Sequence, residues 1–324
     1  MRCWTPLMTG LLLACAALGA RAESDYPNRP IRMVVPLAVA SSVDNAARIM
    51  AQKMSTNMGQ AIIIENLPGA AGVIGAERVA KSPPDGYTIG AFHDGLMTMV
   101  PHLQASLNWD IMKDFEPISL VATIEWGLVT APNAPFDTAA DFIKVAKANP
   151  KRIYYGTGGI GSPQHVAMVL FAADARIQIE HVTYKGATQA ALGVAGGDVQ
   201  VGFQGIATVA PMIRSGKLKL LGVATPGRMA QYPDTPTISE SGLRGFEFSS
   251  WFAMMVPTGT PADIRARLHA EIMKALQDPE VRGKLEALGL KPGGSTPDYL
   301  ARATRAQYAA YGKMMHDAGI KPEH

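Results

Sequence analysis

The chain has 324 residues, enough for two domains of ordinary size, with 48% hydrophobic and 18% charged residues. This balance is typical of a folded globular protein and excludes a disordered chain. The formal net charge is only +3, and no basic block runs along a predicted helix, so we expect no nucleic-acid partner.

Residues 1–22 have the features of a secretory signal peptide. Arg2 gives a positive start, and the apolar run over 7–18 is too short to span a bilayer. Ala20-Arg21-Ala22 supplies small residues at the two positions that a signal peptidase reads. We therefore expect cleavage after Ala22 and export to the periplasm, with an uncleaved anchor or a lipoprotein at Cys15 as alternatives.

Cleavage would change the chemistry of the mature chain. It removes both cysteines, Cys3 and Cys15, and with them any disulfide, thiolate nucleophile or cysteine metal site. It also removes Arg2 and Arg21 but no acid, so the formal net charge falls from +3 to +1. No later apolar stretch is long enough to cross a membrane, so we expect a soluble mature protein.

The first part of the mature sequence alternates β-branched runs with helical stretches. The predicted strands and helices alternate in the order 31–35, 43–58, 61–65, 76–80 and 87–92. Gly59 ends the first helix, and Pro83-Pro84-Asp85-Gly86 is a strong turn signal. This β-α-β-α-β order predicts a parallel sheet with helices on both faces.

A second unit with the same rhythm begins near Trp126. Its predicted helices cover 138–149 and 163–173, and its predicted strands cover 152–155, 177–184, 199–203 and 218–224. Thr260-Pro261 and Thr296-Pro297 then open two longer helices, each with a capping threonine before a proline.

Two extended apolar runs, 115–130 and 250–257, resemble each other. Each contains a tryptophan, and each is followed by a Pro-rich turn. We expect both to cross between two α/β lobes. Lobe 1 would then hold residues 23–122 plus 252–324, and lobe 2 residues 123–251.

Four loops that lead from a predicted strand into a helix are candidate anion sites, because free backbone N–H groups and the helix dipole favour negative charge there. With the end of the strand 199–203 added, the candidate ligand-binding residues are Ala40, Ser41, Ser42, Asp44, His93, Asp94, Thr157, Gly158, Ser162, His165, Tyr184, Lys185, Gly186, Ala187, Thr188 and Gln204.

Several of these residues have a structural alternative. Ser41 or Ser42 could serve only as a helix cap, and Asp94 could be a cap beside a partly exposed His93. Lys185 could point to solvent, and Gln204 could make a purely structural hydrogen bond.

Gly156, Gly158 and Gly161 have the G-x-G-x-x-G spacing of a dinucleotide-binding loop, and Glu180 follows near the end of the next predicted strand. A dinucleotide-using enzyme is therefore one alternative. Lys151-Arg152 is a poor start for the buried strand that such a fold needs, and an exported protein meets few nucleotides. The sequence has no G-x-S-x-G nucleophile elbow, no H-E-x-x-H zinc motif and no Walker loop. We therefore expect no cofactor, no metal and no catalysis.

The mature sequence resembles the Bug-type periplasmic solute receptors of tripartite tricarboxylate transporters over essentially its whole length. The matching motifs are Tyr26-Pro27-x-Arg29-Pro30-Ile31, Val35-Pro36 with Asp44, Glu65-Asn66-x-Pro68-Gly69-Ala70-x-Gly72-x-Ile74-Gly75, Pro84-Asp85-Gly86-Tyr87-Thr88, Phe115-x-Pro117-Ile118, Tyr155-Gly156 with Gly161-Ser162, Tyr184-Lys185-Gly186, Pro233-x-x-Pro236-Thr237, and Trp251-Phe252 before Pro257-x-Gly259-Thr260-Pro261.

The resemblance implies an α/β, two-lobed periplasmic binding protein of the type II, flytrap class with two hinge crossovers. It also implies a monomer that captures a small organic acid and delivers it to membrane permease subunits. The loops after the first strand and around Tyr184 look like the family's carboxylate pincer. A sensory protein that signals to a membrane kinase would need the same cleft.

The sequence departs from the family pattern at four places. Ala40-Ser41 replaces the usual Gly-Gly pair, Gln204 the usual Asp, and Gln189 a common Pro, while His93-Asp94 is atypical. These departures leave the identity of the ligand open.

Overall fold

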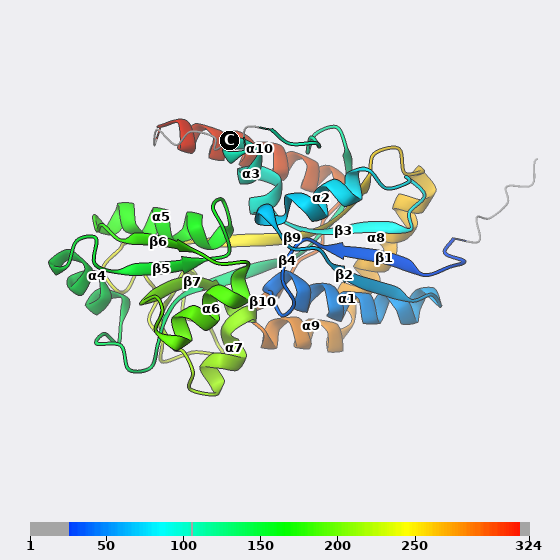
Figure 1. The fold of residues 1–324 in the computed structure, drawn as a ribbon. Helices are drawn as coiled ribbons and strands as arrows, with labels where there is room; N and C mark the ends of the chain where they lie inside the picture. The colour runs from blue at the N-terminus through cyan, green and yellow to red at the C-terminus, as the bar shows by residue number, and fades with distance from the viewer. Residues whose placement is uncertain (1–25, 105, 318–324) are drawn as a thin grey trace, which may run out of the picture.

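The computed structural model describes residues 26–104 and 106–317 (Figure 1). The predicted signal peptide, with its cleavage site and both cysteines, lies outside the described residues. None of the helices in the described part of the chain has both the length and the apolar character that a membrane span requires.

The first β-α units form one half of the sheet, with β1 pairing in parallel to both β2 and β3. The elements are β1 (Ile31–Val35), α1 (Ser42–Met58), β2 (Ile62–Asn66), η1 (Ala70–Gly72), α2 (Val73–Ala80), β3 (Thr88–His93), η2 (Gly95–Met99) and α3 (Val100–Leu103). The predicted parallel sheet is therefore confirmed, with β1 at its predicted bounds and β2 and β3 shifted by one residue.

The middle of the chain forms the other half, in which β5 pairs in parallel to β6 and to β7. Its elements are α4 (Ala139–Ala148), β5 (Tyr154–Thr157), α5 (Pro163–Ala175), β6 (Glu180–Thr183), α6 (Ala187–Gly196), β7 (Val201–Gly205), α7 (Ile206–Arg214) and β8 (Lys219–Val223).

Two long strands join the halves: β4 (Phe115–Thr130) and β9 (Ser249–Pro257), which pair antiparallel to each other. β9 also pairs with β3, whereas the far end of β4 pairs with β7 and β8. The sheet therefore runs in the order β2-β1-β3-β9-β4-β7-β5-β6. The two apolar, Trp-containing runs of the sequence are these two strands, and the predicted lobe boundaries fall inside them.

The end of the chain returns to the first half. Its elements are α8 (Ala262–Gln277), α9 (Pro279–Ala287), β10 (Leu290–Pro292) and α10 (Pro297–Asp317). β10 pairs antiparallel to β4, and α10 contacts η2, α3 and β4. The sequence did not predict α9 or β10.

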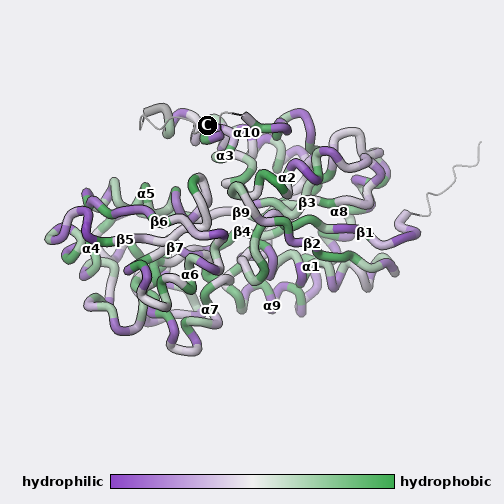
Figure 2. The backbone as a smooth tube through the Cα atoms, viewed as in Figure 1, coloured by the Kyte–Doolittle hydropathy of each residue, from purple (hydrophilic) through white to green (hydrophobic). Residues whose placement is uncertain are grey.

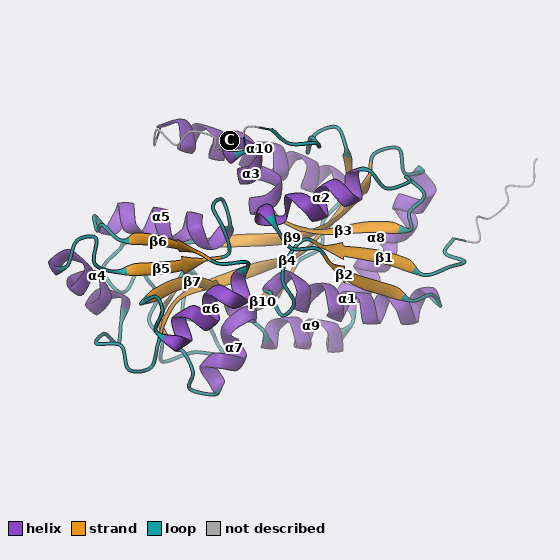
Figure 3. Ribbon diagram, in the orientation of Figure 1, coloured by secondary structure: helices purple, strands orange, loops and turns teal. Residues whose placement is uncertain are grey.

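Helices lie on both sides of the strands in Figure 3, and hydrophobic stretches recur along the strands and the helices that cover them (Figure 2). Local signals in the sequence explain several helix ends, but the predicted cap Thr260 does not cap α8: Pro261 is the cap residue, and Thr260 Oγ1 donates to Pro257 O. The Thr138 and Asp141 side chains form a reciprocal capping box on α4, and Gly59 ends α1 in the left-handed conformation that favours glycine.

Candidate functional site: an inner cavity between the two halves of the sheet

An inner cavity of about 40 Å³, room for a few water molecules, lies between the two halves of the sheet. Its lining residues are Leu37, Ser41, Ser42, Val43, Ala71, His93, Ile124, Trp126, Gly158, Ser162, Pro163, Gln164, Gly186, Ala187, Gly205, Thr208 and Ser250. An outer depression of about 540 Å³ shares Leu37, Ala71, Gly158 and Gly186 with it, and Lys185 lines this outer space.

Four helices begin at the inner cavity. Residues of the first turns or caps of α1, α5, α6 and α7 line it, from both halves of the sheet. The first N–H groups of a helix lack an intrahelical partner, and the helix dipole places partial positive charge there. No Lys, Arg, Asp or Glu side chain is among the lining residues. Backbone groups therefore supply the positive potential of this cavity.

The start of α6, like that of α7, has a glycine cap and no side-chain cap bond. Its cap residue Gly186 offers no side chain to the first N–H groups and has a φ of 145°, which favours glycine. Gly158 of the β5–α5 loop packs directly against it. A Cβ on Gly158 would lie only 2.9 Å from Ala187 N and 3.0 Å from Gly186 C, so only glycine allows this approach.

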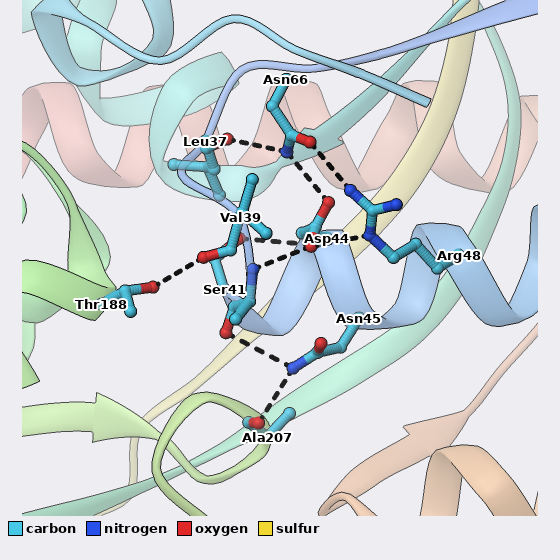
Figure 4. Close-up of polar contacts among 10 residues, drawn as sticks. Leu37, Val39, Ser41, Asp44, Asn45, Arg48, Asn66, Thr188 and Ala207 are labelled. Carbon is cyan, nitrogen blue, oxygen red and sulfur yellow. Dashed lines mark hydrogen bonds and ion pairs between the residues drawn. The ribbon is translucent and has the colours of Figure 1, made fainter. Parts of the chain in front are cut away.

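The β1–α1 loop is held by the buried Asp44 carboxylate (Figure 4). Asp44 Oδ2 accepts from Ala40 N at 2.8 Å and from Arg48 Nε at 3.0 Å, and Oδ1 accepts from Asn66 Nδ2 at 2.9 Å. Ser41 Oγ accepts from Asp44 N and caps α1. Asp44 therefore shapes the loop and does not line the cavity.

Ala40 occupies the left-handed region at φ 63°. A residue with a Cβ pays about 1–2 kcal/mol for this conformation. The Asp44–Ala40 hydrogen bond offsets that cost. The loop is thus strained and held in place by its own helix.

Three hydrogen bonds between described residues join the two halves around the cavity, and Figure 4 draws two of them, Thr188–Val39 and Asn45–Ala207. Thr188 Oγ1 donates to Val39 O at 2.9 Å, and Asn45 Nδ2 donates to Ala207 O at 3.0 Å. The buried hydroxyls of Ser42 and Thr208 lie 3.0 Å apart. The two halves are therefore in contact across the cavity.

The strands supply the rest of the lining, here called the strand wall: His93 of β3, Ile124 and Trp126 of β4, and Ser250 of β9. Ile124 and Ser250 are register partners, and Trp126 Nε1 donates to Ser250 Oγ at 2.8 Å. The strand wall is apolar apart from His93 and Ser250.

His93 is 2% exposed, so the expectation of a partly exposed histidine was wrong: β9 and η2 cover it. Burial lowers the pKa of His93 to about 4, which keeps the ring neutral. Its Nδ1 accepts from Leu96 N at 3.2 Å, whereas Nε2 has no partner among the described residues.

Asp94 does not line the cavity but lies in a buried network with β9 and α10. Its oxygens accept from Gly95 N at 2.9 Å and from Gln307 Nε2 at 3.0 Å, and Gln307 Oε1 accepts from Trp251 Nε1 at 2.6 Å. Burial raises the pKa of Asp94 to about 7 in spite of these bonds. The predicted helix cap is confirmed, since Asp94 caps η2.

A pair of histidines, His165 and His181, forms hydrogen-bond contacts with the β5–α5 loop and its preceding strand. The rings of His165 and His181 lie 4.6 Å apart, and His181 Nε2 is 2.6 Å from Thr157 Oγ1. His165 Nδ1 accepts from Gly161 N at 3.3 Å. Burial, and then the neighbouring His181, lower the pKa of His165 to about 4. Neither ring lines the cavity.

The structure therefore sorts the candidate residues into groups. Those that line the inner cavity are Ser41, Ser42, His93, Gly158, Ser162, Gly186 and Ala187, while Tyr184 and Lys185 line only the outer depression. Those that line neither are Ala40, Asp44, Asp94, Thr157, His165, Thr188 and Gln204. Gln204 is fully buried, and neither atom of its amide has a partner in the described part of the chain. Whether each candidate contacts a ligand stays a prediction.

Four further lining residues, Leu37, Val43, Pro163 and Gln164, belong to the loops predicted as anion sites but were not among the candidate residues. The lining residues that the sequence analysis missed are Ala71, Ile124, Trp126, Gly205, Thr208 and Ser250. Gly205 could have been found as the residue that ends β7 and caps α7. Ala71 and Ser250 have no signal of their own in the sequence.

The dinucleotide spacing is not supported by the position of Glu180. The prediction placed it near the end of a strand, but Glu180 is the first residue of β6 and pairs with Tyr154, the first residue of β5. The acid of a dinucleotide fold belongs at the other end, beside the glycine loop. Across 26–104 and 106–317, no group of three or more His, Cys, Asp or Glu side chains could hold a metal ion.

Comparisons with known proteins agree with this architecture. The sequence model described as "Tripartite tricarboxylate transporter family receptor" matches residues 46–320. Protein BugT of Bordetella pertussis is 32% identical over 314 residues, covering 96% of both chains. A protein of Pseudomonas sp. strain P51, described as a UPF0065 protein in the tcbD-tcbE intergenic region, is 33% identical over 95% of this chain and 93% of its own.

Solved structures give the same result. The periplasmic binding protein BugD matches with a TM-score of 0.87 at 29% identity, over 92% of this chain and 100% of its own. Rpa4515 of R. palustris, solved with adipate, matches with a TM-score of 0.89 at 31% identity over the same shares. MatC of Rhodopseudomonas palustris, with bound malate, matches with a TM-score of 0.83 at 29% identity, over 89% and 99%. The α/β fold is thus that of periplasmic binding proteins.

Proposed function

Because the chain belongs to the receptor family of tripartite tricarboxylate transporters, we propose that it is a periplasmic receptor that captures a small carboxylate in the inner cavity and presents it to a membrane permease. The family and the fold are those of substrate-binding receptors, not of enzymes. The observation that carries the proposal is the meeting of four helix N-termini at one cavity without a cationic side chain.

The charge of a carboxylate matches the potential at the helix starts. A carboxylate offers two acceptor oxygens and a negative charge, and unpaired N–H groups at a helix start provide donors and positive potential. The starts of α6 and α7 have no side-chain cap that would compete with the ligand. Adipate and malate in two structural neighbours are both carboxylates, which supports the same class here.

We place the hinge in β4 and β9, with lobes 23–122 plus 252–324 and 123–251 opening about these strands. The bonds Thr188–Val39, Asn45–Ala207 and Ser42–Thr208 would break on opening. The ligand would enter through the outer depression, which adjoins the inner cavity. We expect the receptor to act as a monomer.

A screen of the purified protein against mono-, di- and tricarboxylates and aromatic acids tests the proposal. A binding acid should stabilise the protein by about 2.7 kcal/mol at a hundredfold excess over its Kd, and tryptophan fluorescence should change because Trp126 lines the cavity. The corresponding neutral amides are the control and should bind more weakly. A screen in which no acid stabilises the protein, or in which NAD does, would contradict the proposal.

A sensory role would use the same cavity but a different partner. Pull-down of the acid-loaded protein with permease subunits and with sensor-kinase ectodomains separates the two roles. Capture of the permease supports transport, whereas capture of the ectodomain alone supports signalling.

A further inference from the structure

The Nε2 atom of His93 is a buried polar group with no partner in the described structure, although the residue lines the inner cavity. Leaving such a group without a partner costs about 1–3 kcal/mol. A ligand atom that accepts a hydrogen bond from Nε2 would remove this cost. Nε2 of His93 should therefore favour ligands that place a hydrogen-bond acceptor beside it.

The structure fixes which proton His93 offers. Nδ1 accepts from Leu96 N at 3.2 Å, so Nδ1 carries a lone pair, and the single proton of the neutral ring lies on Nε2. Leu96 belongs to η2, which continues directly from β3 through Asp94. The hydrogen bond from Leu96 N to Nδ1 thus leaves Nε2 as a donor, which cannot accept a hydrogen bond.

The surroundings of His93 disfavour a second negative charge. The strand wall contains only Ile124, Trp126 and Ser250 beside His93, and no cationic side chain lines the cavity. The next residue, Asp94, carries a fully buried carboxyl group. A ligand carboxylate at the strand wall would be desolvated without a counter-ion, whereas a ketone, hydroxyl or ether oxygen would not pay that cost.

Ser250 adds a second neutral donor on the same wall. Its Oγ accepts from Trp126 Nε1 at 2.8 Å, which leaves its own hydroxyl proton for a ligand oxygen. The helix N-termini that line the rest of the cavity suit a carboxylate. The helix starts and the strand wall therefore differ in the chemistry that they accept.

We infer that His93 determines specificity by donating Nε2–H to an uncharged acceptor oxygen at the far end of a monocarboxylate ligand. The inference rests on the proposed function and deepens it, since it names the class of acid. Preferred ligands are short monocarboxylic acids that carry a ketone, hydroxyl or ether oxygen several bonds from the carboxylate.

Two matched trios of acids test this inference by calorimetric titration. The six-carbon trio is hexanoate, 5-oxohexanoate and adipate, and the five-carbon trio is pentanoate, 4-oxopentanoate and glutarate. Within a trio the near carboxylate is constant, and the far end is a methyl group, a ketone or a second carboxylate. The wild-type protein should bind the keto acid of at least one trio about tenfold or more tightly than both other members.

His93→Leu removes the donor and should abolish the preference for the keto acid over the plain acid. His93→Gln places an amide N–H near the position of Nε2 and should restore much of it. His269→Leu is the matched control, because His269 bonds to Ser295 O and lines neither the inner cavity nor the outer depression. This control should keep the wild-type ranking.

The possible outcomes separate the inference from the proposed function. If the keto acid is the tightest binder in neither trio, or if His93→Leu keeps the keto-acid preference, the inference is wrong while carboxylate capture stands. If none of the six acids binds, the inference is also wrong, and the wider acid screen decides the proposed function on its own. A selective shift of the His93 Nε2 proton resonance by the keto acid would support it.

Discussion

Gly158→Ala should weaken ligand binding more than any other single-methyl change in the β5–α5 loop. The added Cβ would lie 2.9 Å from Ala187 N and 3.0 Å from Gly186 C, and both of these are backbone atoms at the start of α6. Neither can move without moving the helix. The φ of Gly158 lies outside the left-handed region, so the effect arises from contact alone.

The size of the effect follows from these contacts. Blocking one charge-assisted hydrogen bond to the ligand costs about 1.5–3 kcal/mol, so the Kd should rise about 10- to 150-fold. Overpacking should lower the free energy of unfolding by about 1–3 kcal/mol. Calorimetric titration with the tightest acid of the screen measures the first quantity, and urea unfolding measures the second.

Gly196→Ala is the matched control in the same helix. A Cβ there meets nothing within 4 Å, and the residue is not left-handed, so its Kd should equal that of the wild type. A Gly158→Ala protein that binds within twofold of the wild type would refute the assignment of the α6 start to the carboxylate.

Three further changes test the surroundings of the cavity. Asp94→Asn should remove a pH dependence of stability. Because burial raises the pKa of the Asp94 carboxyl to about 7, the wild-type free energy of unfolding should fall progressively from about pH 4 to pH 7, by up to about 4 kcal/mol relative to the variant in unfolding titrations. A pH-independent difference would contradict this. Ala40→Gly should raise the free energy of unfolding by about 1 kcal/mol, because glycine adopts the left-handed φ without strain. The control Ala266→Gly in α8 should lower that free energy by a similar amount. If both variants lose the same free energy of unfolding, the prediction is wrong. Thr208→Val removes the hydroxyl partner of Ser42 and should weaken acid binding about 2- to 12-fold in the same titration, and an unchanged Kd would show that this bond does not help closure.

The elements of the fold could be predicted from the sequence because their signals are local. The alternation of β-branched runs and helices placed β1, α1, β2, β3, α5 and β7 to within a few residues. The long strands β4 and β9 were also visible as apolar runs. Glu180 was misplaced because the run 177–184 reads as one strand, whereas only its second half pairs with β5.

The cavity itself could be predicted only in part. Loops such as Gly186-Ala187 carry a strand-to-helix signal, and both residues do line it. Thr208 and Ser250 also line the cavity but carry no such signal in the sequence, because they reach the cavity only when β4, β7 and β9 pair in the sheet. The burial of His93 likewise depends on the packing of β9 and η2 around it, which no neighbouring residue in the sequence reports.

The most direct test of the central claim is a map of backbone amide shifts by nuclear magnetic resonance during titration with a binding acid. The amides of Val43, Ala187 and Thr208, at the starts of α1, α6 and α7, should shift together with one Kd. Shifts confined to surfaces away from these helix starts would contradict it.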